Sequence, residues 1–110
     1  MEITLFSPNP HGIISAIPSK SYAHRALICA ALSDGVTEIL CSRSSRDIDA
    51  TVSCLRSLGA GIDCSDAGFT VYPIKKAPEF AILHPGESGS TLRFMLPTAA
   101  VLGTECEFVT

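Results

Sequence analysis

Residues 80–93 have the sequence FAILHPGESGSTLR, and this stretch decides the fold class. Its apolar start predicts a strand over 80–84, and its Gly- and Ser-rich centre predicts a tight loop. The apolar positions that follow predict a helix over 90–102, which contains Pro97 and stops at Gly103, and then a strand over 106–109. A strand that leads through a short loop into a helix and a further strand is typical of α/β (α+β) architecture.

Upstream, residues 37–72 show the same alternation of strand and helix. A strand is expected over 37–41, and Ser44 with Asp47 indicates a capping box at the start of a helix that runs to about residue 58. Apolar residues at helical spacing form the inner stripe of this helix, namely Ile48, Val52, Leu55 and Leu58. After Gly59, two short strands over 62–64 and 69–72 predict a hairpin.

The first 35 residues predict two strands and one helix. The strands are expected over 3–6 and 12–17, each closed by proline. The helix is expected over 21–32, with Gly35 as its stop. Apolar residues almost encircle this helix, so we expect it to be buried on most sides.

The composition favours one small folded domain. The chain has 110 residues, of which 46% are hydrophobic and 17% charged, so a packed core is expected and disorder is not. No apolar stretch reaches the roughly 18 residues of a membrane span, and the first residues do not resemble a signal peptide, so a cytoplasmic protein is expected. The net charge of −3 and the scattered cations argue against a nucleic-acid surface.

Cysteine and histidine spacing gives no sign of a metal site. The five cysteines are odd in number and show no C-x-x-C spacing, and they are Cys29, Cys41, Cys54, Cys64 and Cys106. We expect buried free thiols in a reducing compartment, with a zinc site or a nucleophilic cysteine as the alternatives. His11, His24 and His84 share no metal-ligand spacing, so each is expected to be a solvated or core histidine. No metal and no cofactor are therefore expected.

The first candidate binding segment is the start of the helix over 21–32. Ser21 and Arg25 are four residues apart and share a helix face, and Lys20 lies at the entrance to the same turn. One oxyanion could therefore meet a hydroxyl, a guanidinium and free backbone amides. The alternative is an ordinary serine cap beside solvated cations.

The second candidate binding segment is the loop over 86–90. Its amides could converge on an anion as a backbone nest, although an ordinary strand-to-helix turn explains the same residues. It is neither a Walker motif nor a dinucleotide fingerprint, because the required Gly-Lys-Ser/Thr and G-x-G-x-x-G spacings are absent. Two such segments suggest a ligand with more than one anionic group, such as a phosphate and a carboxylate. Asp47 and Asp49 are expected to be capping and solvated.

Taken together, these segments resemble the N-terminal portion of the 5-enolpyruvylshikimate-3-phosphate synthases. The matching residues keep their order and approximate spacing over nearly the whole chain: Pro18-Ser19-Lys20-Ser21, Arg25-Ala26-Leu27, Ala30-Ala31-Leu32, Gly35, Asp47-Ile48, Leu58-Gly59 and Gly86-Glu87-Ser88-Gly89-Ser90-Thr91-Leu92-Arg93. Lys-Ser-x-x-x-Arg combined with the later Gly-x-x-Gly-Ser/Thr-x-x-Arg is specific. The sister UDP-N-acetylglucosamine enolpyruvyl transferases have Lys-Asn at Lys20-Ser21, which favours the shikimate branch.

The resemblance implies a transferase of the shikimate pathway, which leads to chorismate and the aromatic amino acids. The family transfers an enolpyruvyl group from phosphoenolpyruvate to the 5-hydroxyl of shikimate 3-phosphate, without a metal. By resemblance, Lys20 is catalytic and contacts phosphoenolpyruvate. Ser21 and Arg25 would hold shikimate 3-phosphate, and Gly89 with Ser90 would help to bind phosphoenolpyruvate.

The resemblance also implies a fold, an inverse α/β barrel of βαβαββ units in two domains. Residues 1–17 would be strands that join the other domain, and residues 18–110 would be an incomplete N-terminal domain. The chain would then be a fragment of the enzyme, inactive alone, because further arginines, lysines and carboxylates of the family would lie beyond it. Its unpaired N-terminal strands are expected to promote a homodimer.

Three positions depart from the family pattern. Pro18 stands where glycine is common, His24 where asparagine is frequent, and Glu87 where asparagine is common. Glu87 adds a negative charge beside a site for anions. The alternatives are a non-catalytic anion-binding or oligomerising domain of the same fold and a relative of the UDP-N-acetylglucosamine enolpyruvyl transferases. A third alternative is another member of the fold, such as an RNA 3′-terminal phosphate cyclase, which the acidic net charge disfavours.

Overall fold

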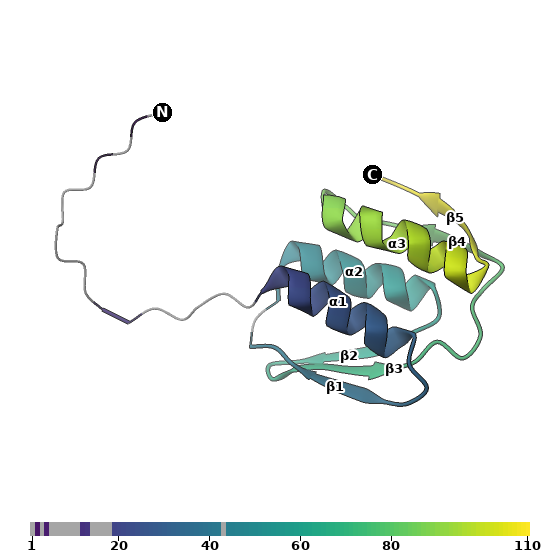
Figure 1. Ribbon diagram of the computed structural model, residues 1–110, viewed down its shortest axis with the longest axis horizontal. Coiled ribbons are helices and arrows are strands. Elements are labelled where there is room, and N and C mark those ends of the chain that lie inside the picture. Colours follow the sequence, from purple (N-terminus) through teal and green to yellow (C-terminus); the bar gives the residue numbers. More distant parts are fainter. Residues whose placement is uncertain (1, 3, 5–11, 14–18, 43) are drawn as a thin grey trace.

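The computed structural model describes residues 2, 4, 12, 13, 19–42 and 44–110. The strands expected over 3–6 and 12–17 fall largely outside these residues, so they and the dimer expected from them stay predictions. The described residues form three helices and five strands (Figure 1). In chain order these are α1 (Lys20–Ala31), β1 (Thr37–Leu40), α2 (Arg46–Ser57), β2 (Gly61–Ser65), β3 (Gly68–Tyr72), β4 (Phe80–Leu83), α3 (Gly89–Leu102) and β5 (Glu105–Phe108). The mixed helix-and-strand class is confirmed.

The three helices lie side by side and begin at the same end of the molecule (Figure 1). α2 is the central helix and contacts both α1 and α3. Its inner stripe is buried as the spacing predicts, with Ile48, Val52, Leu55 and Leu58 all inaccessible to solvent or nearly so. Because the helices are parallel, their first turns, with unpaired backbone N–H groups, form one end of the domain.

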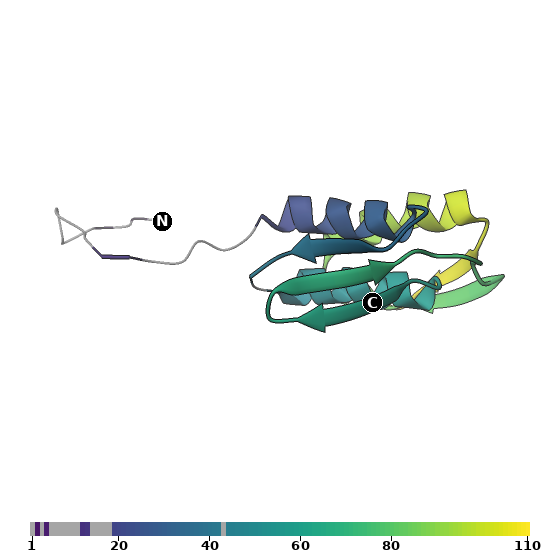
Figure 2. The same ribbon diagram turned by 90° about the horizontal axis from the view of Figure 1, so that it is seen from below.

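The first sheet has the strand order β1-β3-β2 and is antiparallel throughout. It packs against α1 and α2, and Figure 2 shows its strands in front of α2 and below α1. Phe69 and Val71 of β3 point into the core, because alternate residues of a strand share one face. The predicted hairpin between β2 and β3 is confirmed, and Gly68 starts β3 with a φ of 144°.

The second sheet consists of β4 and β5, which pair in parallel. α3 connects these two strands, β4 contacts α2, and β5 contacts α3. Ala81 and Leu83 of β4 face the core, whereas Phe80 and Ile82 are exposed. α3 contains Pro97 and ends at Gly103, whose φ of 71° gives the predicted left-handed cap.

The predictions for α1 need two corrections. The helix ends at Ala31 with Leu32 as its C-cap, so Gly35 is not its stop. Only one face of α1 is buried, whereas Tyr22 is 73% exposed and Leu32 is 43% exposed. The expected burial on most sides is wrong because, among the described residues, α1 packs on α2 and the first sheet and nothing covers its outer side.

One apolar core joins both sheets to the helices. Its buried members are Ala23, Leu27, Ala30, Ala31, Ile48, Val52, Cys54, Leu55, Leu58, Ala60, Ile62, Phe69, Val71, Ala81, Leu83 and Met95. Across the described residues, no helix combines the length and the apolar character that crossing a membrane requires.

Candidate functional site

The site begins with the first turn of α1. Ser19 caps the helix, and its hydroxyl oxygen accepts a hydrogen bond from the Tyr22 amide at 3.5 Å. Lys20 is the first helical residue, and its Nζ lies 3.2 Å from Oδ2 of Asp47 on α2. Both side chains are only partly exposed, at 54% and 39% respectively. The ion pair therefore joins the starts of two helices that are distant in the sequence.

The first turn of α2 differs from the predicted capping box by one residue. Ser45, not Ser44, is the N-cap, and its hydroxyl oxygen accepts from the Ile48 amide at 3.3 Å. Ser44 instead donates to the Asp49 carboxylate. Asp47 is consequently free of the capping role that its spacing suggested and faces Lys20. A carboxylate in the first turn of a helix is favourable, because the N-terminus carries partial positive charge.

The loop before α3 is closed by its own hydrogen bonds. Ser88 is the N-cap of α3, is buried, and accepts from the Thr91 amide at 3.1 Å. The Ser88 amide donates to the Pro85 carbonyl at 3.1 Å, and Gly86 adopts a φ of 60°. Gly89 and Ser90 form the first residues of the helix. The loop over 86–90 therefore forms an ordinary strand-to-helix turn, which was the alternative to a backbone nest for this segment.

A cavity of about 240 Å³ lies between the start of α2 and the loop before α3. Its lining residues are Arg46, Asp47, Ala50, Pro85, Gly86, Glu87 and Ser88. The charged members are one cation and two carboxylates. Lys20 reaches this region through its contact with Asp47.

Ser21 and Arg25 lie elsewhere on α1. Both side chains are exposed. Within the described part of the chain, Arg25 makes no hydrogen bond or ion pair. The structure therefore brings Lys20 to Asp47, whereas Ser21 and Arg25 remain on the open surface of the helix. Their role as binding residues stays a prediction.

A buried chain of polar side chains connects the first two turns of the three helices. Nδ1 of His24 lies 2.7 Å from Oγ1 of Thr51, which lies 2.9 Å from Oγ1 of Thr91. Thr91 Oγ1 lies 2.8 Å from Oγ of Ser88 and 3.2 Å from the Asp47 carbonyl oxygen. The sequence did not single out Thr51, and Thr91 was named only as part of the family motif over 86–93. The available signal for Thr51 was a hydroxyl residue on the otherwise apolar buried face of α2.

Burial sets the protonation of His24 and Cys54. Burial lowers the pKa of His24 below its ordinary value, although the Asp47 carboxylate opposes this and the Lys20 ammonium adds to it. The imidazole is therefore neutral at pH 7. Burial raises the pKa of the Cys54 thiol to about 11, with a smaller opposing effect of the His84 backbone amide. Cys54 is consequently protonated and a poor nucleophile.

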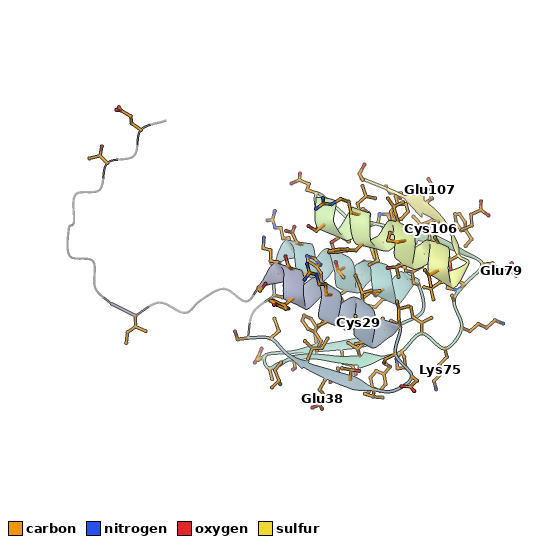
Figure 3. All side chains as sticks on the ribbon, viewed as in Figure 1. Cys29, Glu38, Lys75, Glu79, Cys106 and Glu107 are labelled. Carbon is orange, nitrogen blue, oxygen red and sulfur yellow. The ribbon has the colours of Figure 1, made fainter. Side chains whose placement is uncertain are left out.

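The expectation of buried thiols holds fully only for Cys54, because Cys41 and Cys106 are half-buried. Cys29 and Cys64 are exposed, and Figure 3 shows Cys29 on α1. Cys29 lies on the outer side of α1, where the apolar pattern alone suggested cover. In the part of the chain that the structure describes, no three His, Cys, Asp or Glu side chains form a group suited to a metal ion.

Comparison with known proteins gives one consistent family. The sequence profile of EPSP synthase (3-phosphoshikimate 1-carboxyvinyltransferase) matches residues 8–109. A 3-phosphoshikimate 1-carboxyvinyltransferase of Clostridium kluyveri is 45% identical over 101 residues, covering 88% of this chain and 23% of that protein. The enzyme of the same name from Clostridium beijerinckii is 42% identical over 106 residues, with 89% and 24% covered. That of Methanococcus aeolicus is 40% identical over 92 residues, with 81% and 21% covered. This chain spans about a quarter of the length of these relatives.

Proposed function

Because this chain belongs to the EPSP synthase family, we propose that it forms one side of the active site of a 3-phosphoshikimate 1-carboxyvinyltransferase. The enzyme would transfer the enolpyruvyl group of phosphoenolpyruvate to the 5-hydroxyl of shikimate 3-phosphate and release phosphate. One observation carries the proposal. Lys20 pairs with Asp47, and Asp47 lines a cavity together with the loop before α3, at the end of the domain where three parallel helices begin.

The chemistry of this end suits the substrates. Phosphoenolpyruvate and shikimate 3-phosphate each carry a carboxylate and a phosphate. Helix starts present unpaired N–H groups and partial positive charge, and Lys20 adds a full charge. Fixed donors of this kind accelerate a reaction by orienting the substrates and by stabilising charge that develops in the transition state.

Each proposed binding residue has one task. Lys20 contacts phosphoenolpyruvate, and its ion pair with Asp47 opens when the anion binds. Gly89 and Ser90 contribute backbone amides of the first turn of α3 to the same ligand. Ser21 and Arg25, exposed on α1, bind shikimate 3-phosphate through its carboxylate. Glu87 lines the cavity, so only its backbone can favour an anion there.

The proposal includes the family architecture. Residues 18–110 would belong to the N-terminal domain of an inverse α/β barrel built from βαβαββ units, and residues 1–17 would pair with the other domain. The order of α1, β1, α2, β2 and β3 agrees with such a unit. β4, α3 and β5 would start the next one.

Ligand titration of this chain, followed by NMR, tests the binding half of the proposal. Phosphoenolpyruvate and shikimate 3-phosphate at millimolar concentration should shift the amides of Lys20, Ser21 and residues 88–90. Lys20→Ala should remove the phosphoenolpyruvate response. Lys75→Ala is the matched control, because Lys75 is an exposed lysine at the opposite end of the helices (Figure 3).

A chimera tests the catalytic half. This chain would replace the matching segment of the Clostridium kluyveri relative, and phosphate release from both substrates would be measured. We expect activity that Lys20→Ala lowers at least a hundredfold and Lys75→Ala leaves unchanged. Binding without activity in the chimera would favour the alternative, a non-catalytic anion-binding domain of the same fold.

A further inference from the structure

The starting observation is that the end of the domain proposed to bind anions has a polar interior. His24 is 2% exposed, and Thr51 and Thr91 are 0% exposed. Buried polar groups cost free energy unless they are hydrogen-bonded, and these side chains form one continuous chain of bonds. Among the described residues, no buried side-chain nitrogen or oxygen lacks a partner.

The chain of bonds takes one residue from each helix. His24 lies on α1, Thr51 on α2 and Thr91 on α3. The bond between the two threonines spans 40 positions of the sequence. The geometry of one helix start relative to the others therefore depends on these three side chains.

The same chain ends at the residues that border the cavity. Thr91 Oγ1 contacts the Asp47 carbonyl oxygen and Oγ of Ser88. Asp47 binds Lys20, and Asp47 and Ser88 both line the cavity. A displacement of Thr91 would therefore move both walls of the cavity.

Counting hydrogens fixes the direction of these bonds. The Thr91 hydroxyl has a single hydrogen, which it donates either to the Asp47 carbonyl oxygen at 3.2 Å or to Oγ of Ser88 at 2.8 Å. Because that hydrogen is taken, Thr91 accepts a hydrogen bond from the Thr51 hydroxyl. This bond uses the single hydroxyl hydrogen of Thr51. Thr51 must accept from His24, so Nδ1 of the neutral imidazole carries the hydrogen.

We propose that His24, Thr51 and Thr91 are positioning residues, which hold the starts of the three helices at the spacing that the anion site requires. This inference rests on the proposed function, since it assigns these residues to the geometry of that site. None of the three needs to touch a substrate. Their contribution is preorganisation, because binding groups must be held within about 0.5 Å of their productive positions.

The main test separates positioning from plain structural support. Thr51→Val removes the hydroxyl but keeps a β-branched side chain. Thr51→Ser keeps the hydroxyl and removes only the methyl group. Val52→Ala is the control, because Val52 is the buried neighbour on α2 and lies outside the chain of hydrogen bonds. The measurement is the dissociation constant of phosphoenolpyruvate by NMR titration, well below the unfolding temperature of each variant.

We expect Thr51→Val to weaken phosphoenolpyruvate binding at least fivefold. Thr51→Ser should stay within twofold of the unaltered chain, and so should Val52→Ala, even though it lowers stability. If the unaltered chain binds and Thr51→Val binds equally well, the positioning role alone is wrong. If the unaltered chain gives no response to phosphoenolpyruvate, the proposed function fails and the positioning role fails with it.

A second measurement needs no variant. The ¹⁵N shifts of His24 in the unaltered chain report which ring nitrogen carries the hydrogen. The hydrogen count requires the Nδ1–H form. Observation of the Nε2–H form at neutral pH would overturn the proposed chain of bonds, whatever the titration gives.

Discussion

Lys20 of α1 and Asp47 of α2 form an ion pair across 27 positions of the sequence, with 3.2 Å between Nζ and Oδ2. Both groups are partly exposed, so the pair contributes little to stability, and its main effect is on the charge available to a ligand. An anion that binds Lys20 must compete with the Asp47 carboxylate. The pair thus keeps the lysine in place while lowering its attraction for anions.

The first prediction follows from this competition. Asp47→Asn should bind phosphoenolpyruvate more tightly than the unaltered chain, because the competing charge is gone. It should lose only about 1 kcal/mol of stability, from the ion pair and the helix dipole together. NMR titration and urea unfolding measure the two effects. Weaker binding by Asp47→Asn would show that the carboxylate positions Lys20 more than it competes with the ligand.

The second prediction concerns pH and His24. The pKa of the buried imidazole is below its ordinary value of about 6.5, so below that pH the unfolded chain binds more protons than the folded one. Stability should therefore fall as the pH drops below about 6.5, down to the pKa of the folded state. The Asp47 carboxylate raises the pKa of His24 and so reduces this loss of stability, whereas the Lys20 ammonium lowers the pKa and increases the loss.

His24→Asn is the matched variant for this pH effect. Its amide can still donate to Thr51, but it does not titrate. Urea midpoints at pH 7.5 and pH 5 should differ less for His24→Asn than for the unaltered chain. Equal differences would assign the acid sensitivity to other groups.

Local patterns predicted the elements well. Each described helix and strand lies within two residues of its expected bounds, because apolar spacing and glycine stops act over a few residues. Gly103 and the stripe of α2 are examples. The expected burial of α1 failed, because an apolar sequence does not specify which sides other elements cover.

The candidate site was predictable only in part. Lys20 and the loop before α3 were identified from spacing and from the family resemblance. The pairing of Lys20 with Asp47, and of Thr51 with Thr91, depends on how α1, α2 and α3 pack. No local spacing contains that information, so these partners required the structure.

The third prediction tests the hairpin that supports α1 and α2. A side chain at Gly68 would overlap the Ile39 carbonyl oxygen, and the φ of 144° strains any other residue. Gly68→Ala should therefore destabilise the domain by more than about 2 kcal/mol. Gly35→Ala is the control, because nothing lies within 4 Å of the added atom. Urea unfolding compares the two, and equal losses of stability would contradict the role of Gly68.

The fourth prediction is that these 110 residues alone do not catalyse the proposed transfer. The reaction must remove a proton from the 5-hydroxyl, and the buried imidazole of His24 is bonded to Thr51. The chain spans about a quarter of the length of its relatives, so most candidate proton-transfer groups of such an enzyme lie outside the matched segment. General acid–base catalysis contributes about 10²–10⁴-fold, so its absence should leave the rate at least a hundredfold below that of the chimera. Phosphate release with both substrates is the assay, and shikimate without its phosphate is the control. Turnover by the isolated chain at the rate of the chimera would mean that the proton-transfer group lies among the residues described above.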